Sequence, residues 1–191
     1  MTARRGFSIA LAVMAGVVLP GCMPKMSLEE MRSMMPERPA ELDKLNAFVG
    51  KWETTGKASM AMLEEGSVPV TGEGESKWDS SGWFVVGDFE FSMEGFDPMR
   101  GHETWTYDMH SKKFRSTWTD SMGSTGIGWA THNEEDNTWK MKATSHGPHG
   151  KTMMTGTLKI VDEDTMEWCM TEHAMGGLMK TMEMCGTSTR K

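Results

Sequence analysis

The stretch Trp83-Phe84-Val85-Val86-Gly87-Asp88-Phe89-Glu90-Phe91-Ser92-Met93 alternates apolar and polar residues with a period of two. In an extended chain, successive side chains point to opposite faces, so Val85, Phe89 and Phe91 share a face with Trp83 and Met93. Asp88, Glu90 and Ser92 fall on the other face. One apolar and one polar face is typical of a half-buried antiparallel strand.

Similar alternation recurs along the chain after Gly50, in segments 103–109, 114–118, 127–129, 139–143 and 166–170. Turn residues such as Asp97-Pro98 and Gly176-Gly177 separate these segments. We count about ten short strands between residues 48 and 190, more than one flat sheet holds without curling. The predicted fold is therefore all-β: an antiparallel up-and-down barrel, which also removes exposed sheet edges. A short helix over residues 40–48, introduced by Pro39, is expected to cap one end.

The first 21 residues have the features of a lipoprotein signal peptide. Arg4 and Arg5 precede a short apolar run over residues 7–19, which is too short to span a membrane. The run ends in Leu19-Pro20-Gly21-Cys22, which resembles the bacterial lipobox, in which the cysteine is acylated. We expect acylated Cys22 to hold the protein on a membrane of the bacterial cell envelope. The alternative is an ordinary cleaved signal followed by an incidental cysteine.

Residues 22–39 are expected to form a tether, and residues 40–191 a single barrel domain. Within the tether, Ser27-Leu28-Glu29-Glu30 matches a capping box, which predicts a short amphipathic helix that Pro36 ends. Disorder is an equally good interpretation, because isolated helices of this length are marginal in water.

The composition excludes some classes of protein and raises one question. A formal charge of −7 disfavours nucleic acid as a partner, and 3 cysteines are too few for a disulfide-built scaffold. Methionine is abundant: 20 of the 22 lie from residue 22 onward, against 14 Ile, Leu and Val together. Because methionine fills irregular gaps and contacts aromatic rings well, most of these residues are expected to pack in the core.

Three segments carry a resemblance to a known family. They are Leu45-Asn46-Ala47-Phe48-Val49-Gly50-Lys51-Trp52, Gly82-Trp83-Phe84-Val85-Val86, and Trp105-Thr106-Tyr107-Asp108 through Lys113-Phe114. They resemble a bacterial family catalogued as protein of unknown function 1579, over about residues 40–190. That family is similar to calycin-type barrels, such as lipocalins and nitrobindins, which implies a small-molecule cavity. Nitrobindins open with Gly-x-Trp-x-Gly-x-Gly, whereas Thr54 stands at the second of these glycines, which argues against haem.

No motif for a nucleophile or for phosphate binding occurs, and the protein is predicted not to be an enzyme. Neighbouring His102 and Glu103 would point to opposite faces of a strand, so they cannot form a catalytic pair. The favoured function is the binding of a small apolar ligand in the lumen. The candidate lining residues are Trp83, Phe89, Phe91, Trp105, Tyr107, Trp118, Trp129, Trp139, Met141 and Trp168.

The C-terminal hairpin, centred on Gly177, places residue 169 opposite residue 185. One interpretation is a disulfide between Cys169 and Cys185, which an oxidising envelope would favour. The other is a Cu(I) site, because thiolate, thioether and imidazole groups suit copper. By parity, His173, Met175 and Met179 would share a face with the two cysteines. These residues are weak metal candidates, and no cofactor is predicted.

The sequence is also compatible with two other functions. The methionine content fits a protein that handles a soft metal or buffers oxidation, and an exposed apolar patch would favour a structural or interaction module. The sequence does not fix the oligomeric state.

Overall fold

The computed structural model describes residues 25–191, so the predicted signal peptide and Cys22 lie outside the described residues. The chain divides into two compact units, one ending at Glu37 and the other covering Arg38–Lys191. Within residues 25–191, no helix is both long and apolar enough to cross a membrane.

In the first unit, helix α1 (Leu28–Ser33) begins at the predicted capping box. The Ser27 backbone N–H donates to Glu30 Oε2 at 2.6 Å, and the Glu30 N–H donates to Ser27 Oγ at 3.2 Å. These two bonds satisfy backbone donors that the first helical turn would otherwise leave free. Of the two interpretations of the tether, the structure shows the helix.

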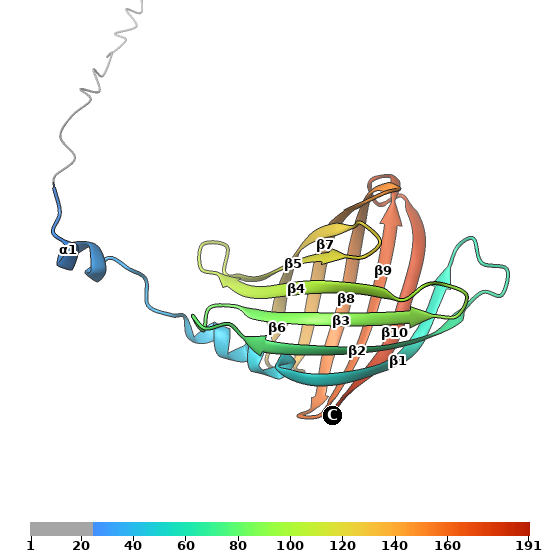
Figure 1. The fold of residues 1–191 in the computed structure, drawn as a ribbon, viewed down its shortest axis with the longest axis horizontal. Coiled ribbons are helices and arrows are strands. Elements are labelled where there is room, and N and C mark those ends of the chain that lie inside the picture. The colour runs from blue at the N-terminus through green and yellow to red at the C-terminus, as the bar shows by residue number, and fades with distance from the viewer. Residues whose placement is uncertain (1–24) are drawn as a thin grey trace, which may run out of the picture. The chain divides into compact units, whose positions relative to one another are not determined.

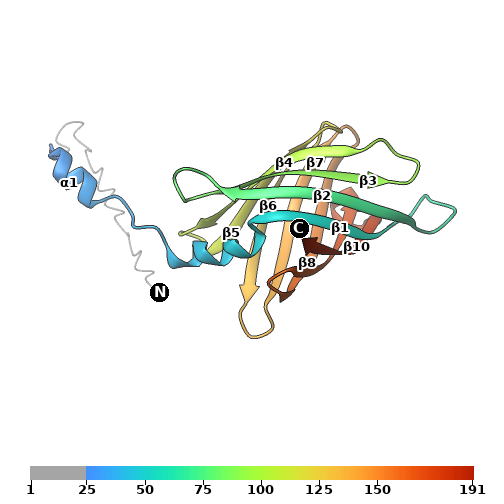
Figure 2. The ribbon, with the colours of Figure 1, turned by 60° about the horizontal axis from the view of Figure 1, so that its bottom comes forward.

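The second unit is a closed antiparallel barrel in which each strand pairs with its neighbours along the chain, and β10 closes against β1 (Figures 1 and 2). The strands are β1 (Gly50–Met60), β2 (Val68–Trp78), β3 (Val85–Met93), β4 (Met99–Asp108), β5 (Lys113–Asp120), β6 (Thr125–Asn133), β7 (Thr138–Gly147), β8 (Gly150–Asp162), β9 (Thr165–Ala174) and β10 (Met179–Arg190). The predicted ten-stranded barrel is confirmed.

One end of the barrel is closed by the helix η1 (Ala40–Phe48), which is a 3₁₀ rather than an α-helix (Figure 2). Leu42 and Leu45 are fully buried and pack in one cluster with Val85, Phe114 and Trp139. Phe48, at the end of this helix, contacts the rings of Trp105 and Trp139 with centroid distances of 5.4 Å and 4.9 Å.

The other short 3₁₀ segment, η2 (Met175–Gly177), forms the turn between β9 and β10. Met175, Gly176 and Gly177 all have positive φ there, a conformation that glycine adopts without strain. The predicted register of this hairpin is confirmed, because Cys169 pairs with Cys185.

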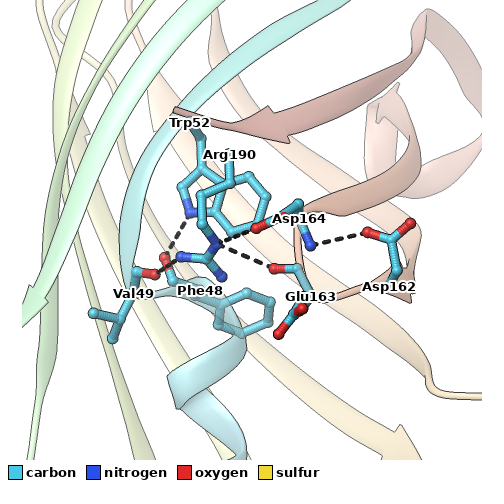
Figure 3. Close-up of polar contacts among 7 residues, drawn as sticks. All are labelled: Phe48, Val49, Trp52, Asp162, Glu163, Asp164 and Arg190. Atoms are coloured by element: carbon cyan, nitrogen blue, oxygen red, sulfur yellow. Dashed lines mark hydrogen bonds and ion pairs between the residues drawn. The ribbon is translucent and has the colours of Figure 1, made fainter.

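Arg190, at the end of β10, connects the last strand of the barrel with residues at the start of β1 (Figure 3). Its guanidinium lies 4.3 Å from the centroid of the Trp52 ring. It donates to the carbonyl oxygens of Val49 and Glu163 and pairs with Asp164 at 3.3 Å. Trp52 Nε1 in turn donates to the Phe48 carbonyl at 3.0 Å, so the helix, β1, β10 and the β8–β9 turn meet here.

Candidate functional site

The side chains that face the lumen alternate with those that face outward along each strand. In β6, for example, Gly126, Gly128 and Ala130 are buried, and the residues between them are not. Cross-strand pairing carries this phase around the barrel, because paired residues lie on the same face. It places Phe89, Phe91, Trp105, Tyr107, Trp118, Trp139, Met141 and Trp168 on the inner face, and Trp83 packs against the cluster at the helix end.

Trp129 does not line the lumen, which corrects the expectation from its sequence segment. It alternates with the buried glycines of β6 and therefore faces outward, where Arg115 stacks 5.0 Å from its ring centroid. The inward positions of β6 hold small residues because neighbouring strands fill the space in front of them. A Cβ at Gly126 would overlap the ring of Trp118.

Glycine and aromatic residues are paired across the inner wall. Four inward rings lie over an inward glycine of an adjacent strand, and a Cβ on any of these glycines would come within 3.0 Å of a ring atom. The pairs are Phe89 over Gly101, Phe91 over Gly72, Trp118 over Gly126 and Trp168 over Gly186. These four rings therefore lie against the wall of the barrel.

Three inward rings are less completely buried than the rings at the helix end. Trp139 and Phe114, beside the helix, are 1% and 4% exposed. Phe89, Trp118 and Trp168 each keep an intermediate exposure although they face inward. These three rings are therefore less completely covered than the rings beside the helix.

One carboxyl group lies among these rings. Glu103 in β4 faces inward, between Gly87 of β3 and Trp118 of β5. Its Oε2 accepts a hydrogen bond from Trp105 Nε1 at 3.0 Å. Burial raises the pKa of Glu103, and the bond from Trp105 offsets part of this effect. His102 faces outward and pairs with Asp88, so the predicted separation of His102 and Glu103 is seen in the structure.

Another inward carboxyl group, that of Glu172, is already well supplied with donors. Glu172 in β9 accepts hydrogen bonds from Thr152 Oγ1 at 3.2 Å and from Thr181 Oγ1 at 2.8 Å. Sequence reasoning had not marked either carboxyl as part of the lumen. The sequence did hold a sign that Glu103 faces inward, because it lies two and four residues from Trp105 and Tyr107 in the same strand.

Two hollows among the described residues are lined mostly by outward side chains, together with Phe89 in one and Trp118 in the other. The larger, about 740 Å³, is lined by Trp52 and by charged side chains that include Lys51, Glu75, Glu90 and Arg100. These side chains form ion pairs with one another, Lys51 with Glu75 and Arg100 with Glu90. The second hollow, about 450 Å³, is lined mainly by threonines.

The C-terminal hairpin holds a disulfide between Cys169 and Cys185, on the outer face of the barrel. Both sulfur atoms are therefore bonded to each other and are not thiolate ligands. A register shift between Lys180 and Met182 places Met179 opposite Ala174, not on the face of Cys185, which corrects the parity argument. Met175 is 71% exposed in the turn. His173 pairs with Lys180, and within residues 25–191 no three His, Cys, Asp or Glu gather as a metal site.

Comparison with solved structures supports the fold. An S-type phycobiliprotein lyase, CPES from Guillardia theta, shares 12% identity at a TM-score of 0.57, over 87% of this chain and 98% of that one. Rv2717c from M. tuberculosis shares 12% identity at a TM-score of 0.62, over 81% and 99%. At such identities the likeness shows the fold alone. No curated protein matches the chain.

The comparison with protein families agrees with the resemblance seen in the sequence. The model of the family described as "Protein of unknown function (DUF1579)" matches residues 37–188, which cover η1 and the barrel almost completely. The chain belongs to the DUF1579 family.

Proposed function

We propose that this protein binds a small apolar ligand inside its barrel, without catalysing a reaction, while acylated Cys22 holds it on a membrane of the cell envelope. The observation that supports binding is the state of the inner wall. Phe89, Trp118 and Trp168 lie against the barrel wall over glycines, and each keeps part of its surface exposed. Such a wall would offer apolar contact area to a ligand inside the barrel.

Binding is tested with the neutral apolar fluorophore N-phenyl-1-naphthylamine and the purified full chain. Saturable fluorescence enhancement near one probe per chain is expected, because the aromatic wall would exclude water from the dye. The variant Trp118→Ala removes one ring of the wall and should weaken binding. The outward Trp129→Ala is the matched control and should leave the affinity unchanged. Enhancement that does not saturate, or that responds only to the Trp129 change, would contradict lumen binding.

The membrane anchor is tested separately. In a bacterial host, the full chain should partition with membranes, and mass spectrometry should find an acylated cysteine at the mature N-terminus. Cys22→Ser should move the protein into the soluble fraction, since two or more acyl chains are needed for stable anchoring. Membrane association that survives this change would contradict the anchor and leave ligand binding unaffected.

Soft-metal handling is not favoured as a second function. The two sulfur ligands that the hypothesis needed are joined in a disulfide.

A further inference from the structure

We infer that the lumen is selective for organic cations, molecules that join an ammonium-type group to an apolar body, and that Glu103 is the residue that anchors them. This inference rests on the proposed function, because it requires the ligand to enter the barrel. It adds the chemical class of the ligand and the group that recognises it.

The hydrogen bonding of Glu103 is incomplete. Trp105 Nε1 donates to Oε2 at 3.0 Å, and no donor within the described residues reaches Oε1. The inward carboxyl group of Glu172, by contrast, receives hydroxyl donors from Thr152 and Thr181. With one donor on Oε2, the carboxyl group of Glu103 keeps an oxygen that can pair with a bound positive charge. Glu103 is therefore the better anchor of the two.

The inner wall offers no free Lys or Arg among the described residues to pair with the carboxyl group of Glu103. Among Lys and Arg of the described strands, only Arg190 occupies an inward position, next to Trp52. Its guanidinium is already committed to Asp164 and to the carbonyl oxygens of Val49 and Glu163. No protein cation is left to pair with Glu103, so the ligand would have to supply one.

Aromatic residues surround the carboxyl group of Glu103. Trp105 follows two residues along the same strand, Trp118 is the cross-strand partner, and the Phe89 ring lies over neighbouring Gly101. Organic cations are attracted to the faces of such rings, and this attraction strengthens when the cation leaves water. A carboxyl group bordered by three aromatic residues thus combines two features that favour an ammonium group. An anionic ligand would be repelled by Glu103 and Glu172.

The selectivity is measured by calorimetric titration of the full chain with three amphiphiles that share a decyl chain, each below its micelle concentration. They are decyltrimethylammonium, neutral decyl glucoside and anionic decyl sulfate. We expect the cation to bind at least about tenfold more tightly than the other two, as one charge-assisted contact would give. Glu103→Gln should weaken the binding of the cation by about tenfold and change the affinity for the glucoside by less than about twofold.

The matched control is Glu167→Gln, which removes a carboxyl group from the exposed face of β9 and should leave all three affinities unchanged. Thermal unfolding of each variant checks that it is folded. Equal affinity for cation and glucoside, or a cation affinity that Glu103→Gln does not alter, would overturn the inference while leaving lumen binding intact. If none of the three amphiphiles binds, the proposed function fails together with it.

Discussion

Replacing Gly126 with alanine tests whether the aromatic rings are held against the barrel wall by glycine. The new Cβ would overlap three atoms of the Trp118 ring, far inside ordinary contact at 3.4 Å, so the ring would have to move by about 1 Å or more. Overpacking of this kind costs about 1–3 kcal/mol, and the lower entropy of the unfolded alanine chain returns part of it. We expect a net loss of about 1–2 kcal/mol, or about 2–8 °C in the unfolding midpoint.

The assay is thermal unfolding followed by tryptophan fluorescence, in the original chain and in a Trp118→Leu background. With the ring gone, Gly126→Ala should be nearly neutral, because its Cβ then meets free space. Gly74→Ala is the control for an inward glycine without a ring over it, where the nearest atom is the Asp88 carbonyl oxygen at 3.1 Å. It should cost less than Gly126→Ala. An equal loss in both Trp118 backgrounds would refute the proposed packing.

Three other changes test separate parts of the structure. The double change of Cys169 and Cys185 to serine opens a link with a sequence separation of 16 residues and should cost about 3 kcal/mol, measured by urea unfolding without reductant; a loss below about 0.5 kcal/mol would contradict it. Arg190→Lys keeps the charge but loses the planar contacts to Trp52 and two carbonyls, so it should cost about 2–4 kcal/mol in the same assay, and an unchanged midpoint would count against the closure. Because burial raises the pKa of Glu103, the folded chain binds this proton more tightly than the unfolded chain, and stability falls as pH rises from about 4.3 upward through the raised pKa. Glu103→Gln should therefore raise the melting temperature most at neutral pH and little near pH 4, whereas a gain that is constant with pH would be inconsistent with this titration.

The strands and the closure of the barrel were predictable because a period of two is a local property of the sequence. Segment 83–93 and its counterparts alternate over enough residues to mark an inner face, and turn residues separate them. The hairpin register was predictable for the same reason, since Gly176-Gly177 marks the turn. The helix that caps the end also followed from local signals, Pro39 before it and Gly50 after it.

The content of the lumen was less predictable because it depends on contacts between strands. Trp129 was predicted to line the lumen because segment 127–129 alternates like the other strands. Trp118 of the neighbouring strand occupies the space in front of β6, so only glycine or alanine fits inward there. Met179 was misplaced because the register shift beside it interrupts the alternation.

Glu103 illustrates a different limit of sequence reasoning. The sequence places Glu103 on the same face of its strand as Trp105, but an acidic residue in a strand is most often exposed. Only the closed barrel shows that this carboxyl group faces an aromatic interior with a single hydrogen-bond donor. The inward glycines were likewise visible in the sequence, but the sequence did not show which rings cover them.

The central claim is that the barrel interior holds a ligand. A crystal structure of the full chain soaked with (11-bromoundecyl)trimethylammonium tests it most directly, because bromine is located by its anomalous scattering. We predict one bromine peak inside the barrel, with the ammonium group at the other end of the ligand beside Glu103. A lumen filled by its own side chains, or bromine found only on the outer face, would contradict the claim.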